Sequence, residues 1–252
     1  MRNLNDLIGT VVRGTDADIG VLHDFLFDDH FWAVRYMVVK AGDWLNGREL
    51  LLSPLSIDAM EEARSLLHVG FDRQTIAKSP EIDIDLPISR QQEIELHEHY
   101  QWPFYWDPDA DSALGPGSLA AVPLVELGRE MHETKDALGP EHPVNLRSAQ
   151  GVTGYRLHAR DGEVGKLDDF VIEDEAWNIL YLIIETGTWL SNRKVLISPQ
   201  WIEKVDWPET QIYVDLKKDT IQHSPELDLS SPIDREYETS LYDHYGKNQY
   251  WK

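Results

Sequence analysis

The feature that most constrains this chain is an internal duplication at an offset of 145 residues. Residues 20–54 align without a gap to residues 165–199, and the match runs on to the Tyr-Trp pairs at 105–106 and 250–251. Over positions 7–106, 33 of the 100 residues are identical to the residue 145 positions later. Repeats of solenoid proteins have periods of roughly 20–50 residues, so this longer period predicts two whole domains.

The duplication divides the sequence into three parts. Residues 1–106 and 149–252 are the two repeats, and each ends in a predicted helix and an aromatic tail. Residues 107–148 have no counterpart, and their Pro, Gly and acidic content predicts a linker. We expect a short helix within the linker, over residues 122–134.

Each repeat carries mainly strand signals. Runs rich in Val, Ile, Tyr and Trp, interrupted by glycine and by Asn46-Gly47, are typical of half-buried strands joined by tight turns. The predicted strands are residues 22–27, 32–40, 48–52 and 66–71, with their counterparts 167–172, 177–185, 193–197 and 212–216. Short helices are expected at residues 72–77 and 218–222. Longer ones should start after Ser89, which can form a capping box with Gln92, and after Asp234.

These signals predict a mainly β (α+β) protein. We expect two tandem small β-barrels built from antiparallel sheets, each followed by short C-terminal helices and related to the other by pseudo-two-fold symmetry. Fusing the two repeats in one chain would make an intramolecular pseudo-dimer at high effective concentration. Further homo-oligomerisation stays open.

The composition excludes several classes of function. The chain has no cysteine, which removes disulfides, thiol catalysis, iron–sulfur clusters and cysteine-based zinc sites. Its 23 basic and 45 acidic residues give a net charge of −22, and no basic patch suited to nucleic acid is visible. No apolar stretch approaches the roughly 20 residues of a membrane helix, and no signal peptide is found. We therefore expect a cytoplasmic protein without direct membrane insertion.

Sequence signatures of enzymes are missing. The chain has no nucleophile elbow, phosphate loop, dinucleotide fingerprint or zinc-protease motif. Hydrolysis by a pair of carboxylates leaves no such motif and stays open. The prediction is a protein that is not an enzyme and that uses no cofactor.

One pattern of residues in the repeats resembles a known family. It consists of a glycine-led strand with Asp and Phe, a strand rich in Trp and Tyr, a Gly-x-Trp-Leu-x-x-Arg element leading into Ser-Pro, and later Ser-Pro-Glu and Pro-Ile-x-Arg elements. In the first repeat these are Gly20, Asp24, Phe25, Trp32, Tyr36, Gly42, Trp44, Leu45, Arg48, Ser53, Pro54, Ser79–Glu81, Pro87, Ile88 and Arg90. The pattern resembles the PRC-barrel family, over about 200 of the 252 residues.

The resemblance implies a fold and a mode of action. The family includes the cytoplasmic domain of the photosynthetic reaction centre H subunit and the C-terminal domain of a ribosome-maturation factor. We expect this protein to have neither the membrane helix of the former nor the separate N-terminal domain of the latter. The resemblance therefore implies a tandem PRC-barrel protein that acts as an adaptor, and it implies no reaction.

Six aromatic residues retained in both repeats are candidates for a contact with a partner or between the repeats. They are Trp32, Tyr36, Trp44, Trp177, Tyr181 and Trp189. Large aromatics anchor many interfaces. They also fill the cores of small barrels, and this structural interpretation is the one we favour for them.

Two arginines and several aspartates are candidates for structural roles. We expect Arg48 and Arg193 to form ion pairs, with Asp24 and Asp169 as partners. In the reaction-centre family, carboxylates near the barrel help to conduct protons toward a quinone. That role would fall to Asp24, Asp29, Asp169 and Asp174, but no quinone-binding motif accompanies them, so a solvated acidic surface is the favoured interpretation.

Two short motifs suggest metal ligands only weakly. Asp107, Asp109 and Asp111 alternate as at the start of a calcium loop, but Ser112 and Ser118 replace the Gly and Glu that such a loop requires. In His97-Glu98-His99, only His99 recurs, as His244. On a helix the two imidazoles would point to different sides. We predict no metal site.

The sequence thus favours a non-catalytic, PRC-type protein-binding module. Its expected partner is a protein, and the resemblance points to a photosynthetic or other membrane electron-transport complex that would hold the module at its periphery. Two alternatives stay open: a sensor that binds a small ligand or metal, and an acidic stress-type cytoplasmic protein.

Overall fold

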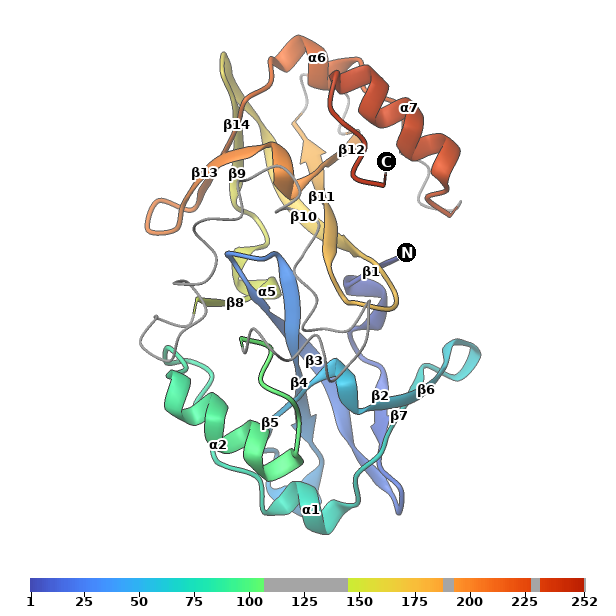
Figure 1. The fold of residues 1–252 in the computed structure, drawn as a ribbon, viewed down its shortest axis with the longest axis vertical. Coiled ribbons are helices and arrows are strands. Elements are labelled where there is room, and N and C mark those ends of the chain that lie inside the picture. Colours follow the sequence, from blue (N-terminus) through green and yellow to red (C-terminus); the bar gives the residue numbers. More distant parts are fainter. Residues whose placement is uncertain (107–144, 188–192, 228–231, 252) are drawn as a thin grey trace. The chain divides into compact units, whose positions relative to one another are not determined.

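The structure is a computed structural model that describes residues 1–106, 145–187, 193–227 and 232–251 (Figure 1). It comprises two compact units, and each draws on both repeats. The first unit consists of Leu4–Gln150 and Asp174–Asn178. The second consists of Met1–Asn3, Gly151–Glu173 and Ile179–Lys252. These units differ from the predicted boundaries at residues 106 and 149, because short segments of each repeat belong to the unit that the other repeat mainly builds.

The first unit contains a seven-stranded sheet among its described residues. Its strands lie in the order β5-β4-β3-β2-β7-β6, and β8 pairs with β3. They are β2 (Val11–Arg13), β3 (Asp18–Asp28), β4 (Ala33–Ala41), β5 (Glu49–Leu52), β6 (Ile57–Glu61), β7 (Leu66–Val69) and β8 (Leu146–Ser148). We predicted a purely antiparallel sheet, and this is wrong, because β2 and β7 pair in parallel.

The second unit repeats this topology. The order is β12-β11-β10-β9-β14-β13, and β1 pairs with β10. The strands are β1 (Arg2–Asn3), β9 (Arg156–Ala159), β10 (Gly162–Ile172), β11 (Ile179–Thr186), β12 (Lys194–Ile197), β13 (Ile202–Asp206) and β14 (Gln211–Val214). Here β9 and β14 form the parallel pair. Two sheets of matching order in tandem confirm the prediction of a mainly β tandem protein.

The central strands supply most of the core. The first seven residues of β4 are all buried, and so are the first six residues of β11. Such unbroken burial is typical of strands covered on both faces. The tight turn predicted before β5 is confirmed. Asn46 and Gly47 adopt positive φ angles of 52° and 69° there.

The four helices predicted for the two repeats are present, and a further one, α5, was not predicted. They are α1 (Arg73–Ala77), α2 (Arg90–Tyr100), α5 (Ala149–Val152), α6 (Lys218–Gln222) and α7 (Arg235–Tyr245). Short 3₁₀ turns are η1 (Asn5–Leu7), η2 (Asp43–Leu45), η3 (Pro54–Ser56), η4 (Glu62–Arg64) and η7 (Pro199–Trp201). Ser89 and Gln92 form the expected capping box, and Asp234 accepts from the Tyr237 backbone N–H. Both predicted helix starts are therefore confirmed.

Some predictions fall outside the described residues. These are the helix over residues 122–134, the alternating carboxylates Asp107, Asp109 and Asp111, and Trp189. Within the ranges that the structure does describe, no helix is long and apolar enough to cross a membrane.

Candidate functional site

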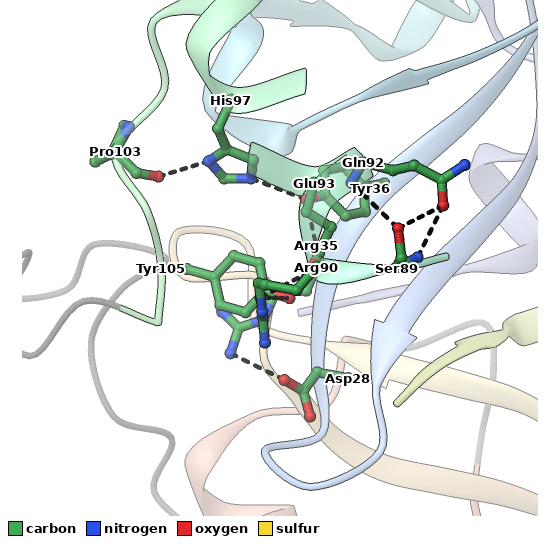
Figure 2. Close-up of polar contacts among 10 residues, drawn as sticks. All are labelled: Asp28, Arg35, Tyr36, Ser89, Arg90, Gln92, Glu93, His97, Pro103 and Tyr105. Carbon is green, nitrogen blue, oxygen red and sulfur yellow. Dashed lines mark hydrogen bonds and ion pairs between the residues drawn. The ribbon is translucent and has the colours of Figure 1, made fainter. Parts of the chain in front are cut away.

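A buried carboxylate lies at the centre of a cluster of polar contacts in the first unit (Figure 2). Glu93 is on the first turn of α2, and its side chain is fully buried. Its Oε1 atom accepts hydrogen bonds from the Tyr36 hydroxyl at 2.9 Å and from the Tyr105 hydroxyl at 2.7 Å. Its Oε2 atom lies 2.6 Å from Nη1 of Arg90. These contacts compensate for the loss of water around the charge.

His97 extends this cluster by one helical turn. Its Nε2 atom lies 2.8 Å from the Tyr36 hydroxyl, and its Nδ1 atom lies 2.8 Å from the carbonyl oxygen of Pro103. A carbonyl can only accept, so Nδ1 carries the proton and donates it to Pro103. The aromatic tail closes over the imidazole, because the rings of Trp102, Phe104, Tyr105 and Trp106 all contact it.

The chain Pro103–His97–Tyr36–Glu93 has room for one additional proton. It contains three hydrogen-bond contacts, and each needs one hydrogen atom between its two heavy atoms. A neutral His97 and the Tyr36 hydroxyl supply two. A hydrogen atom in the third contact requires a second proton on His97 or a proton on Glu93. The cluster can therefore hold a proton in a dry site, which is its distinctive chemical capability.

Burial sets the proton affinities of these groups. Burial raises the pKa of Glu93, and the nearby Arg90 guanidinium opposes this effect. Burial also lowers the pKa of His97 to about 4, because the charged imidazolium loses its water. The pKa values of Tyr36 and Tyr105 lie well above their usual range, first through burial and then through the negative charge of Glu93.

Arginines connect the cluster to the barrel and the tail. The Arg35 guanidinium lies 4.1 Å from the ring centroid of Tyr105 and 3.9 Å from a carboxylate oxygen of Asp28. Arg90 lies 4.0 Å from the ring centroid of Trp106. Cation–π contacts of this kind hold the tail residues against α2 and β4.

The second unit contains the same carboxylate cluster in shorter form. Glu238 on α7 is fully buried, and its Oε1 atom accepts from the hydroxyls of Tyr181 at 2.7 Å and Tyr250 at 2.8 Å. Arg235 Nη1 lies 2.9 Å from its Oε2 atom. Tyr242 stands where the first unit has His97, and Leu180 stands where it has Arg35. The histidine chain is therefore specific to the first unit.

The predicted aromatic candidates are mostly core residues. Tyr36 and Tyr181 are fully buried in the two carboxylate clusters. Trp32 and Trp177 are buried at the hairpin tips with φ angles of 55° and 59°, a left-handed conformation that is uncommon for aromatic residues. Trp177 lies in the first unit, where its ring centroid is 5.9 Å from that of Phe25. Trp44 donates from Nε1 to the carbonyl oxygen of Ile19.

The expected pairing of Asp24 with Arg48 is wrong. Arg48 donates from Nη2 to the carbonyl oxygens of Ser79 and Pro80, at 2.7 and 2.6 Å, and Nη1 lies 3.9 Å from Glu81. Its guanidinium fixes the loop after α1 through these carbonyls, since a planar fork of donors suits several acceptors.

Arg193 donates to the carbonyl oxygens of Gln222 and Ser224, of which Ser224 is the counterpart of Ser79. The Asp24 carboxylate instead accepts from the backbone N–H groups of Phe25 and Gln150 and from the Ser148 hydroxyl. Asp169 accepts from the Phe170 N–H.

The remaining candidates have structural partners. Asp29 pairs with Arg147 at 2.7 Å. Asp174 lies in the part of the second repeat that belongs to the first unit. His99 and His244 contact the carbonyl oxygens of Thr75 and Thr220 at 2.9 and 2.7 Å, so each holds its helix to the short helix before it. Among the described residues, no group of three or more His, Asp or Glu side chains is placed to hold a metal ion.

Sequence reasoning missed the centre of the cluster. Glu93 lies in a polar run and gives no sign of burial, and neither does Arg90. The only available signal is the duplication, because Glu93, Arg90, Tyr105 and Trp106 are identical to Glu238, Arg235, Tyr250 and Trp251. Polar residues that are identical in the two repeats therefore indicate buried contacts.

The comparisons with known proteins agree with this architecture. Residues 157–221 match the model of the PRC-barrel domain. This match lies in the second repeat, and the duplication extends the pattern to the first. This segment of the second repeat is therefore a PRC-barrel domain, and domains of this family are generally non-catalytic modules. No curated protein matches the chain.

Proposed function

We propose that this protein is a non-catalytic binding module that docks on a larger protein assembly. This function is supported by the bonding of its buried polar side chains to one another. Glu93, His97 and Tyr36 are buried and bonded to one another, and Glu238 and Tyr181 are bonded in the same way. Groups enclosed in this way stabilise a scaffold and meet no substrate. The function then depends on the surface of the module.

The observation that carries the proposal is an exposed segment between α1 and α2. Glu81, Asp83 and Asp85 are exposed, and the half-buried Ile82 and Ile84 alternate with them. Leu86 follows, and at 62% it is the most exposed of the large hydrophobic residues that the structure describes. An exposed apolar side chain framed by carboxylates suits a partner with a basic rim around an apolar pocket.

Local hydrogen bonds shape this segment before any partner binds. The Asp83 carboxylate accepts from the Asp85 backbone N–H at 3.0 Å, and the Leu86 N–H donates to the Asp83 carbonyl at 3.3 Å. Arg48 fixes its start through the carbonyls of Ser79 and Pro80. A contact loop that is already ordered loses less conformational entropy on binding.

The family resemblance supports a more specific form of the proposal. In this form, the assembly is a photosynthetic or other membrane electron-transport complex, and the module binds its cytoplasmic face. The net charge of −22 opposes direct adhesion to anionic lipid, so recruitment would rest on protein contacts.

The test is native capture of the tagged full chain from a lysate that includes detergent-solubilised membranes. We expect one stoichiometric complex at about 0.1 M salt and its weakening at about 0.5 M, because screening shortens the reach of surface charge. The variant Asp83→Asn/Asp85→Asn should retain about tenfold less of it.

The matched control is Glu95→Gln/Glu98→Gln, which removes the same charge from two exposed positions of α2. Equal retention by the two variants would show that this segment is not the contact. Capture of no complex by the wild type would contradict docking, and would favour the alternatives of a ligand sensor or a stress-type protein.

A further inference from the structure

The first unit is completed by a strand that comes from beyond residues 107–144. β8 pairs antiparallel with the end of β3, with Leu26 opposite Ser148, Phe27 opposite Arg147 and Asp28 opposite Leu146. The ladder continues where the Asp29 N–H donates to the carbonyl oxygen of Asn145 at 3.0 Å. An edge of β3 that would otherwise expose its backbone groups is thereby covered.

Side chains make this pairing selective. Arg147 Nε lies 2.7 Å from Oδ2 of Asp29, whose side chain is only 8% exposed. The buried Asp24 carboxylate accepts from the Ser148 hydroxyl and, at 3.0 Å, from the Gln150 backbone N–H. Backbone pairing supplies affinity in strand addition, and side-chain contacts of this kind supply specificity.

A segment of the second repeat, Asp174–Asn178, also completes the first unit. The Val34 N–H donates to the Trp177 carbonyl at 3.0 Å, and Ala33 forms a β-bridge with Asn178. The Trp177 ring packs against Phe25. In the opposite direction, the second unit receives β1, where Arg2 lies opposite Ile172 and Asn3 opposite Val171.

We propose that the β3 edge of the first unit is a strand-acceptor site whose partner is the segment Asn145–Gln150, which leads into the second repeat. Asp24 and Asp29 recognise that segment through Ser148, Gln150 and Arg147. The site holds the two repeats together whether or not residues 107–144 connect them. This inference is independent of the docking function.

The experiment uses the full chain with a protease site introduced between residues 107 and 144. After cleavage, we expect the two products to elute together in size-exclusion chromatography, with the mass of the uncleaved protein. Separation of the products at micromolar concentration would overturn the proposal.

A pair of variants tests the recognition itself. Arg147→Ala/Ser148→Ala removes the contacts of the donor strand, and the dissociation constant of the cleaved protein should rise at least about tenfold. Arg13→Ala is the control. It removes the exposed ion pair between Arg13 and Asp18, which lies in the same sheet. Equal dissociation constants for variant and control would refute the assigned contacts. Far-UV circular dichroism of the uncleaved variants establishes that both remain folded before cleavage.

Discussion

Single residues account for much of what the duplication retains. Glu93 is bonded to two tyrosines and one arginine, and each of these has an identical counterpart around Glu238. A buried carboxylate is tolerated only with such a full set of partners, because an isolated charge in a dry core is costly. These four residues therefore have to be retained together in both repeats.

Removing the charge of Glu93 should destabilise the folded protein. We expect Glu93→Gln to lower the free energy of unfolding by about 3 kcal/mol, because Arg90 would keep its buried charge without the carboxylate. Glu95→Gln on the exposed face of the same helix should change it by less than about 0.5 kcal/mol. Urea unfolding measures both. Similar values for the two variants would contradict the structural role of Glu93.

His97 predicts a pH dependence with a defined sign. Burial lowers its pKa from 6.5 to about 4 in the folded protein. Between these pH values, the unfolded chain binds a proton at this position that the folded protein does not. The contribution of His97 to stability is therefore complete above about pH 6.5 and declines as the pH falls toward 4. The raised pKa of Glu93 acts in the opposite sense, so a variant is needed to separate the two.

Comparison with His97→Gln isolates this contribution. On acidification from pH 7 to pH 5, the wild type should lose about 2 kcal/mol more stability than the variant. Denaturant unfolding of both proteins at the two pH values gives the difference. An equal loss in both proteins would show that His97 titrates normally.

At the scale of elements, close approach of backbones explains two glycines. A Cβ atom on Gly20 or Gly165 would lie 2.1 Å from the carbonyl oxygen of Lys40 or Glu185 on the neighbouring strand. β3 and β4, and likewise β10 and β11, can lie this close only where a side chain is missing. The first glycine of the family pattern is therefore a packing requirement.

Gly20→Ala should lower stability by about 3 kcal/mol, because the backbone of β4 would have to move. Gly42→Ala is the control: its φ is −71°, and the nearest atom to an added Cβ lies 3.5 Å away, on the Trp44 side chain. This variant should stay within about 0.5 kcal/mol of the wild type. Thermal or urea unfolding decides, and an equal effect of the two variants would refute the close-packing explanation.

Elements with strong local signals were predictable, and elements that depend on distant partners were not. The long strands β3, β4, β10 and β11 follow from β-branched and aromatic runs, and α2 follows from its capping box. The three-residue β8 could not be predicted, because its partner β3 lies about 120 residues earlier. The burial of Glu93 and His97 was also hidden, since their helix reads as polar and only tertiary contacts enclose it.

At the scale of the whole molecule, the charge balance and the enclosed clusters favour function at the surface. With 45 acidic and 23 basic residues, the protein would meet basic partners faster and with more selectivity than acidic ones. The two repeats supply scaffolds in which the buried carboxylates, tyrosines and histidine are bonded to one another. The segment between α1 and α2 differs from the rest of the surface, because it exposes the apolar Leu86 among carboxylates.

The most direct test of the docking function compares two leucines in the same native capture. Leu86 and Leu55 are both exposed, at 62% and 38%, and each can be replaced by serine with little expected effect on the fold. Quantitative mass spectrometry should find the captured complex reduced about tenfold for Leu86→Ser and unchanged for Leu55→Ser. Equal amounts of the complex on the wild type and on Leu86→Ser would contradict the proposed docking segment.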